Sequence, residues 1–98
     1  MNIQAMMKQA QAMQKDMASK KEELNQMEFN GSSSIVTVKV NGKKQILKID
    51  VEDKENFNKE DLEVLEDMLV VAINDAFSKV DEESKKILGD LNGMSDLL

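Results

Sequence analysis

The sequence predicts an α+β fold in one domain of 98 residues, with a long helix, a small antiparallel sheet and a second long helix. Residues 2–27 combine strong helix formers with apolar residues at alternating three- and four-residue spacing. Residues 35–51 alternate apolar and polar side chains around an Asn-Gly pair, which is typical of a β-hairpin. Residues 58–88 return to helical spacing, so two helices flank a short β-segment.

The first helix carries an apolar stripe along its whole length. The stripe consists of Ile3, Met6, Ala10, Met13, Met17, Leu24 and Met27. At about 1.5 Å per residue it extends for roughly 37 Å, whereas a compact domain of this size has a radius of gyration of only about 13 Å. The rest of the chain is too small to cover such a stripe, so we expect a homodimer. Its first-helix contacts are predicted at Met6, Met13 and Met17.

The β-segment is expected to form strands over residues 35–40 and 43–51, joined at Asn41-Gly42 by a two-residue type I′ turn. In that register Val36 faces Leu47, and Lys39 faces Lys44. The predicted core face comprises Val36, Val38, Val40, Leu47, Ile49 and Val51. Residues 28–30 also fit a short strand.

The second helix is predicted from an N-cap at Asn58 to about Leu88, with carboxylates in its first turn. Its main apolar stripe comprises Leu62, Leu65, Leu69, Ala72, Ile73, Ala76, Phe77 and Val80. An adjoining stripe of Val64, Met68 and Val71 is expected to contribute to the dimer interface. Residues 89–98 are expected to form a loosely docked tail of the single domain.

The composition argues against an enzyme. Cysteine, histidine, arginine, tyrosine and tryptophan are absent, so acid–base catalysis would need Asp, Glu or Lys with a strongly displaced pKa. A chain this small can hardly build the deep pocket that such a shift requires. Adjacent acids on a helix, as at residues 81–83, point to different faces and cannot enclose a metal. We expect no metal, no cofactor and no small-molecule substrate.

Charge is distributed unevenly along the chain. The net charge is −6, yet residues 1–21 contain four lysines and the single acid Asp16. Residues 39–48 contain four lysines and no acid. The sequence thus predicts two basic zones on an acidic body. No apolar run approaches the roughly 20 residues of a membrane span, so we expect a cytoplasmic protein without a membrane partner.

The basic residues on the helices are candidates for contact with nucleic acid. Lys8 and Lys15 lie two turns apart on the polar side of the first helix, together with Gln11. The alternative is a solvated helix face, and for the lysines late in the second helix it is complementarity to the helix dipole. The candidate DNA-binding residues are Lys8, Gln11, Lys15, Lys20, Lys21, Lys79, Lys85 and Lys86.

Four segments resemble the YbaB/EbfC family of bacterial nucleoid-associated proteins. They are Met7-Lys8-Gln9-Ala10-Gln11 with Met13-Gln14, Val38-Lys39-Val40-Asn41-Gly42, Ile49-Asp50, and Ile73-Asn74-Asp75-Ala76. The resemblance implies an α-β-β-β-α protomer in a tweezers-like homodimer that engages double-stranded DNA in the nucleoid. Arginine, whose planar fork suits bidentate recognition of guanine, is absent, and lysine contacts phosphate as a point charge, so we expect little sequence specificity.

The sequence therefore favours a nucleoid-associated homodimer that organises the nucleoid or modulates expression. An alternative is a small acidic homodimer that binds a partner protein through its methionine-rich helices, as a chaperone or scaffold would; the sequence pI of about 4.6 favours this second interpretation. A third is a structural dimer that binds nothing strongly.

Overall fold

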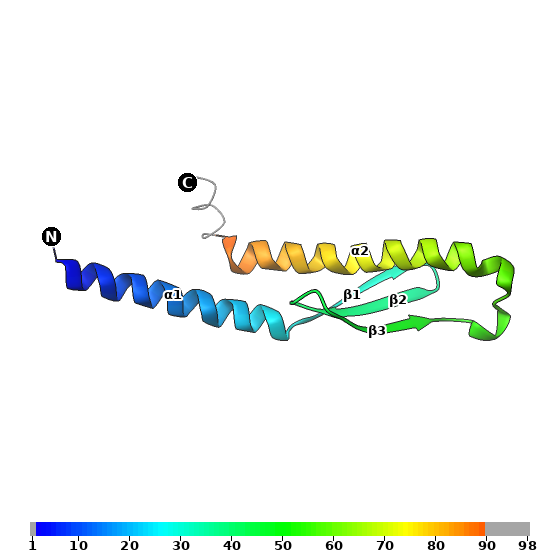
Figure 1. Cartoon of the computed structure of the whole chain (residues 1–98), viewed down its shortest axis with the longest axis horizontal. Helices are drawn as coiled ribbons and strands as arrows, with labels where there is room; N and C mark the ends of the chain where they lie inside the picture. The colour runs from blue at the N-terminus through cyan, green and yellow to red at the C-terminus, as the bar shows by residue number, and fades with distance from the viewer. Residues whose placement is uncertain (1, 90–98) are drawn as a thin grey trace.

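The computed structural model describes residues 2–89, which form one helix, a three-stranded antiparallel sheet and a second helix (Figure 1). The elements are α1 (Ile3–Gln26), β1 (Glu28–Ser33), β2 (Val36–Asn41), β3 (Ile46–Val51) and α2 (Leu62–Ile87), with short 3-10 turns η1 (Lys54–Asn56) and η2 (Lys59–Asp61) before α2. The predicted α+β class and α-β-β-β-α order are confirmed, and β1 is longer than the short strand expected. Of the predicted tail, residues 90–98 lie outside the described residues.

Helix α1 projects from one end of the sheet as an arm (Figure 1). Asn2 caps its start, because its side-chain oxygen accepts a hydrogen bond from the Gln4 amide at 3.1 Å. Leu24 is the only buried residue of α1, so most of the helix has no neighbour among residues 2–89. The molecule is consequently 71 Å long but only 24 Å and 15 Å across.

The loop between β2 and β3 is longer than predicted. The Asn41 side-chain oxygen accepts hydrogen bonds from the amides of Lys43 and Gln45, at 2.9 and 3.0 Å, and Lys44 adopts a positive φ of 60°. The backbone amide of Asn41 donates to the backbone carbonyl of Gln45 at 3.1 Å. This is the pattern of a three-residue loop whose last residue is left-handed. The predicted type I′ turn is therefore wrong, and β3 starts at Ile46.

The longer loop changes the register of β2 and β3. Val36 pairs with Val51 rather than Leu47, and Lys39 pairs with Lys48 rather than Lys44. A bulge follows Lys39. Up to the bulge the pairing moves each partner by four residues, so Ile49 and Val51 stay on the same face as Val38 and Val36.

Helix α2 packs over β1 and β2 and leaves β3 exposed except at Val51, which is half-buried against the core (Figure 1). Beneath it the valines of β2 and three small or branched residues of α2 form the buried core, namely Val36, Val38, Val40, Ala72, Ala76 and Val80. Leu47 and Ile49 on β3 remain 49% and 45% exposed. The prediction that these two residues are core residues is wrong for the single chain, because α2 does not extend over the third strand.

The contact between β1 and α2 is a contact between backbones. A Cβ atom added at Gly31 would overlap the Ala72 carbonyl oxygen and the Ala76 amide nitrogen. Along the outer edge of β1, the Ser32 amide donates to the Asp75 carboxylate at 3.1 Å, and the Lys79 ammonium donates to the Asn30 carbonyl at 2.6 Å. Side chains of α2 thus form hydrogen bonds with two backbone groups on the outer edge of β1.

Replacing Gly31 by alanine should lower the free energy of unfolding by about 1–3 kcal/mol, because the added methyl group forces β1 away from α2. Urea denaturation followed by circular dichroism measures the change. Gly89→Ala is the matched control, since a Cβ atom there meets nothing within 4 Å. Equal stability of Gly31→Ala and the control would contradict the close packing.

Candidate nucleic-acid interface

The outer half of α1 carries basic and amide side chains that project into solvent. Lys8, Gln11 and Lys15 are all exposed, and they follow one face of the arm at four- and three-residue spacing. Among the described residues, neither lysine has a carboxylate within ion-pair distance, as the ion pairs found involve other lysines. These two ammonium groups are therefore available to an anionic ligand.

The electrostatics of α1 favour an anion near its beginning. No acid occurs in its first turn, and the first acid of the chain is Asp16. The amino-terminal end of a helix also carries a partial positive charge from its unpaired amides. The tip of the arm is thus positive although the protein as a whole has a net charge of −6.

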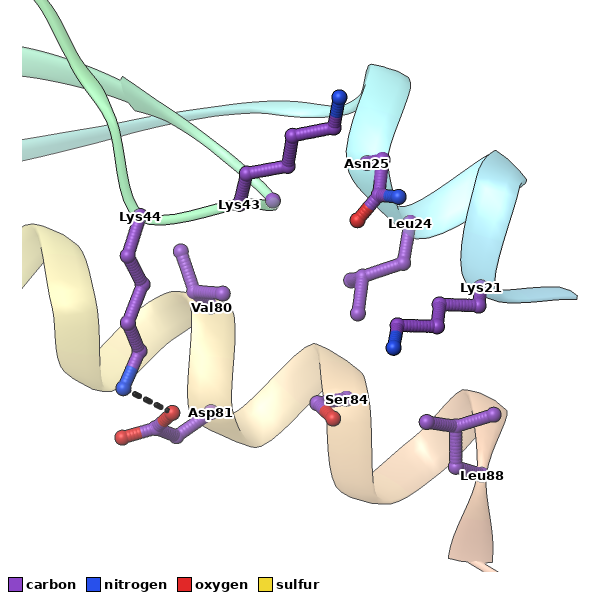
Figure 2. A pocket seen from close by; sticks show the side chains of 10 residues that line it. Lys21, Leu24, Asn25, Lys43, Lys44, Val80, Asp81, Ser84 and Leu88 are labelled. Atoms are coloured by element: carbon purple, nitrogen blue, oxygen red, sulfur yellow. Dashed lines mark ion pairs between the residues drawn. The ribbon is translucent and has the colours of Figure 1, made fainter. Parts of the chain in front are cut away.

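Closer to the sheet, the lysines of α1 are less available. Lys20 forms an ion pair with Asp16 at 3.2 Å, one helical turn away. Lys21 lines a cleft of about 470 Å³ between the base of α1, the β2–β3 loop and the end of α2. Figure 2 shows the Lys21 side chain directed into the space between the two helices.

The same cleft brings in lysines of the β2–β3 loop that were not among the candidate DNA-binding residues. Lys44 is held by Asp81 at 2.7 Å and lies 5.8 Å from the centre of the Phe77 ring. Lys43 is directed away from that pair (Figure 2). The four lysines within residues 39–48 were the signal for this basic loop, but only the packing of the loop beside α1 makes Lys43 line the same cleft as Lys21.

The candidate lysines of α2 differ in their surroundings. Lys79 is engaged within the chain, since it donates to the Asn30 carbonyl and lies 3.7 Å from Asp75. Lys85 and Lys86 are exposed in the last turn of α2. Because the end of α2 shares the cleft with the base of α1, these two lysines lie nearer to the base of the arm than to its tip.

The residues predicted at the dimer interface form two separate groups. Met6, Met13 and Met17 lie on the arm and are 56%, 44% and 41% exposed. Val64 and Val71 are exposed and Met68 is half-buried in the first half of α2, at the opposite end of the molecule (Figure 1). Their role at an interface stays a prediction.

Over residues 1–95 the chain matches the model of the YbaB/EbfC DNA-binding family. The chain belongs to this family. Nucleoid-associated proteins of Streptococcus pyogenes serotype M1 and Streptococcus agalactiae serotype III are each 44% identical to it over 95 residues, 95% of this chain and 95% of theirs. The crystal structure of an uncharacterized protein from Helicobacter pylori has the same fold, with a TM-score of 0.76 and 22% identity over 93% of this chain and 97% of the other.

This YbaB/EbfC chain is therefore related to bacterial nucleoid-associated proteins, as the sequence motifs predicted. Within residues 2–89, no helix is both long enough and apolar enough to cross a membrane. The described part of the chain also holds no group of three or more acidic side chains placed to bind a metal ion.

Replacing Lys79 by alanine should lower the free energy of unfolding by about 0.5–1.5 kcal/mol, because the Asn30 carbonyl loses its charged donor. Thermal or urea denaturation measures the change. Lys86→Ala removes the same charge from the same helix at an exposed position and should stay within about 0.5 kcal/mol of the natural protein. An equally small effect of Lys79→Ala would show that its bond to β1 contributes no net stability.

Proposed function

We propose that the protein binds double-stranded DNA as a homodimer with little sequence specificity, and so organises the nucleoid or modulates expression. The observation that carries the proposal is the α1 arm, an exposed helix whose outer half bears no acid and whose Lys8 and Lys15 form no ion pair with any residue in 2–89. An isolated helix about 10–12 Å across fits the major groove of B-DNA, which is about 12 Å wide.

The absence of arginine supports low specificity. Lysine contacts a phosphate as a point charge, whereas bidentate recognition of guanine relies mostly on the planar guanidinium group. Gln11 is the amide between the two lysines of the arm and would contact sugar, phosphate or a base edge. The contacts proposed here are therefore mainly to the backbone of the duplex.

The acidic body limits the strength of binding. We expect about three to six phosphate contacts per dimer, so that the logarithm of the binding constant falls with the logarithm of salt concentration at a slope of about −3 to −5. Fluorescence anisotropy of a labelled duplex of arbitrary sequence, titrated at several salt concentrations and compared with single-stranded DNA, tests the proposal. No binding even at about 20 mM salt would overturn it and favour the alternative of an acidic dimer that binds a partner protein.

Replacing both Lys8 and Lys15 by alanine should make the salt slope less steep by about 2–4, according to whether one or both arms of the dimer contact the duplex. The same anisotropy titration measures the slope. Lys54→Ala with Lys59→Ala is the matched control, because it removes the same charge from exposed positions at the far end of the molecule. Equal slopes for the two double variants would place the DNA contacts away from the arm.

A further inference from the structure

The two long helices carry opposite arrangements of charge. In α2 the first turn contains Glu63 and the last turn contains Lys85 and Lys86, which suits a helix dipole that is positive at the beginning and negative at the end. In α1 the first turn contains no acid and the last turn no base. Two acids, Glu22 and Glu23, lie instead near its end. Unlike the charges of α2, those of α1 therefore do not stabilise their own helix through its dipole.

The charge changes sign along one side of α1. Residues seven apart in a helix lie on nearly the same side, because seven residues make almost two turns. Lys8, Lys15 and Glu22 have this spacing, so they follow one another along the arm at intervals of about 10 Å. All three side chains are exposed. The side of the arm that carries the proposed DNA contacts thus becomes acidic two turns beyond Lys15.

Glu22 forms no ion pair with any lysine of residues 2–89, because the ion pairs in that part of the chain involve other acids. Its carboxylate accepts a hydrogen bond from the Gln26 side chain at 3.0 Å, which leaves its negative charge in place. Its neighbour in the sequence, Lys21, is directed into the space between α1 and α2 (Figure 2). The carboxylate of Glu22 is therefore available to repel an anion at the base of the arm.

The seven-residue spacing shows what a shift of the arm along a duplex would do. In the proposed function Lys8, Gln11 and Lys15 supply the contacts to the duplex. If the duplex lay two helical turns closer to the sheet, the equivalent positions would be Lys15, Ala18 and Glu22. Such a shift replaces an amide by a methyl group and a lysine by an acid. It therefore loses two contacts and places a carboxylate beside a phosphate.

Coulomb's law gives the size of this effect. In water, two like charges about 5 Å apart change an equilibrium constant roughly fourfold. Exchanging an attracted pair of lysine and phosphate for a repelled pair of carboxylate and phosphate therefore changes the constant by up to about 16-fold. Beyond about 8–10 Å, salt at physiological concentration screens most of the interaction. Glu22 thus acts strongly on a phosphate beside it and weakly on a phosphate that Lys15 holds, about 10 Å away.

We propose that Glu22 acts as an electrostatic stop on the arm, which confines a bound duplex to the outer half of α1. Phosphates then lie beside Lys8 and Lys15 and do not advance to the base of the arm. The proposal rests on the DNA binding of the proposed function and adds the position of the duplex along α1. Glu23 widens the acidic zone, since it is exposed one residue further round the helix.

Removal and reversal of the charge test the stop in the anisotropy titration of a labelled duplex. Glu22→Gln should tighten binding about two- to fourfold at about 50 mM salt, since it removes the repulsion and still offers an oxygen to Gln26. Glu22→Lys places a cation in line with Lys8 and Lys15. It should tighten binding at least about tenfold and make the salt slope steeper by about 1–2, according to whether one or both arms contact the duplex.

The position of the duplex is tested by combining variants. Lys8→Ala should weaken binding by the natural protein, because the duplex cannot move to the base of the arm to replace the lost contact. In the Glu22→Lys background the same change should cost at least about threefold less, since the duplex can then use Lys15 and the new cation. Equal losses in the two backgrounds would show that position 22 does not set the position of the duplex, and would overturn the stop.

Glu55→Gln and Glu55→Lys are the controls for net charge, because they make the same changes at an exposed position at the far end of the molecule (Figure 1). Their affinities should stay within about twofold of the natural protein, and circular dichroism verifies the fold of each variant. Equal gains at Glu22 and Glu55 would overturn the stop, as would Glu22 variants that bind like the natural protein; the proposed function stands in both cases. A natural protein and Glu22 variants that all fail to bind at about 20 mM salt would overturn both.

Discussion

The backbone contact between β1 and α2 determines where everything else in this structure lies. At Gly31 the strand approaches Ala72 and Ala76 so closely that no side chain fits between them. Such an approach fixes the helix over the first two strands, where the valines of β2 are wholly buried. A helix held there cannot also cover β3, so the third strand keeps an apolar face and an open edge. The compact part of the molecule and its exposed surfaces thus have one cause.

A second contact sets the direction of the arm. The Gly42 amide donates to the Met27 carbonyl at 3.1 Å, and a Cβ atom on Gly42 would overlap the Leu24 carbonyl oxygen. The β2–β3 loop is therefore seated on the last turn of α1, and Leu24 is buried there. Beyond this turn α1 has no support from the sheet, which is why its methionines stay exposed.

The division of charge reconciles an acidic protein with the DNA-binding family to which it belongs. The acids lie beyond the outer half of α1: Asp16 pairs with Lys20 on the helix itself, and Glu28, Asp75 and Asp81 in the body each form an ion pair with a lysine. The outer half of α1 carries lysine without acid and extends away from the body. Distance matters because charges in solvent are screened over about 8–10 Å at physiological salt. A phosphate at the tip of the arm would be largely shielded from the repulsion of the body.

Local patterns in the sequence were enough to predict the two helices, the hairpin and the lysines of the arm. Helical periodicity depends on neighbours three and four residues apart, so α1 matched its predicted range to within one residue at each end. No acid precedes Asp16, and Lys8 and Lys15 form no ion pair with the described part of the chain. The side-chain bonds of Asn41, which lengthened the loop and changed the strand register, could not be read from an Asn-Gly pair that also suits a shorter turn. Only the tertiary structure decided which apolar strand residues are buried and which lysines are engaged. Asp81 pairs with Lys44, and Lys79 bonds to the Asn30 carbonyl, although each pair is tens of residues apart in the sequence. Such contacts depend on the position in which α2 packs on the sheet.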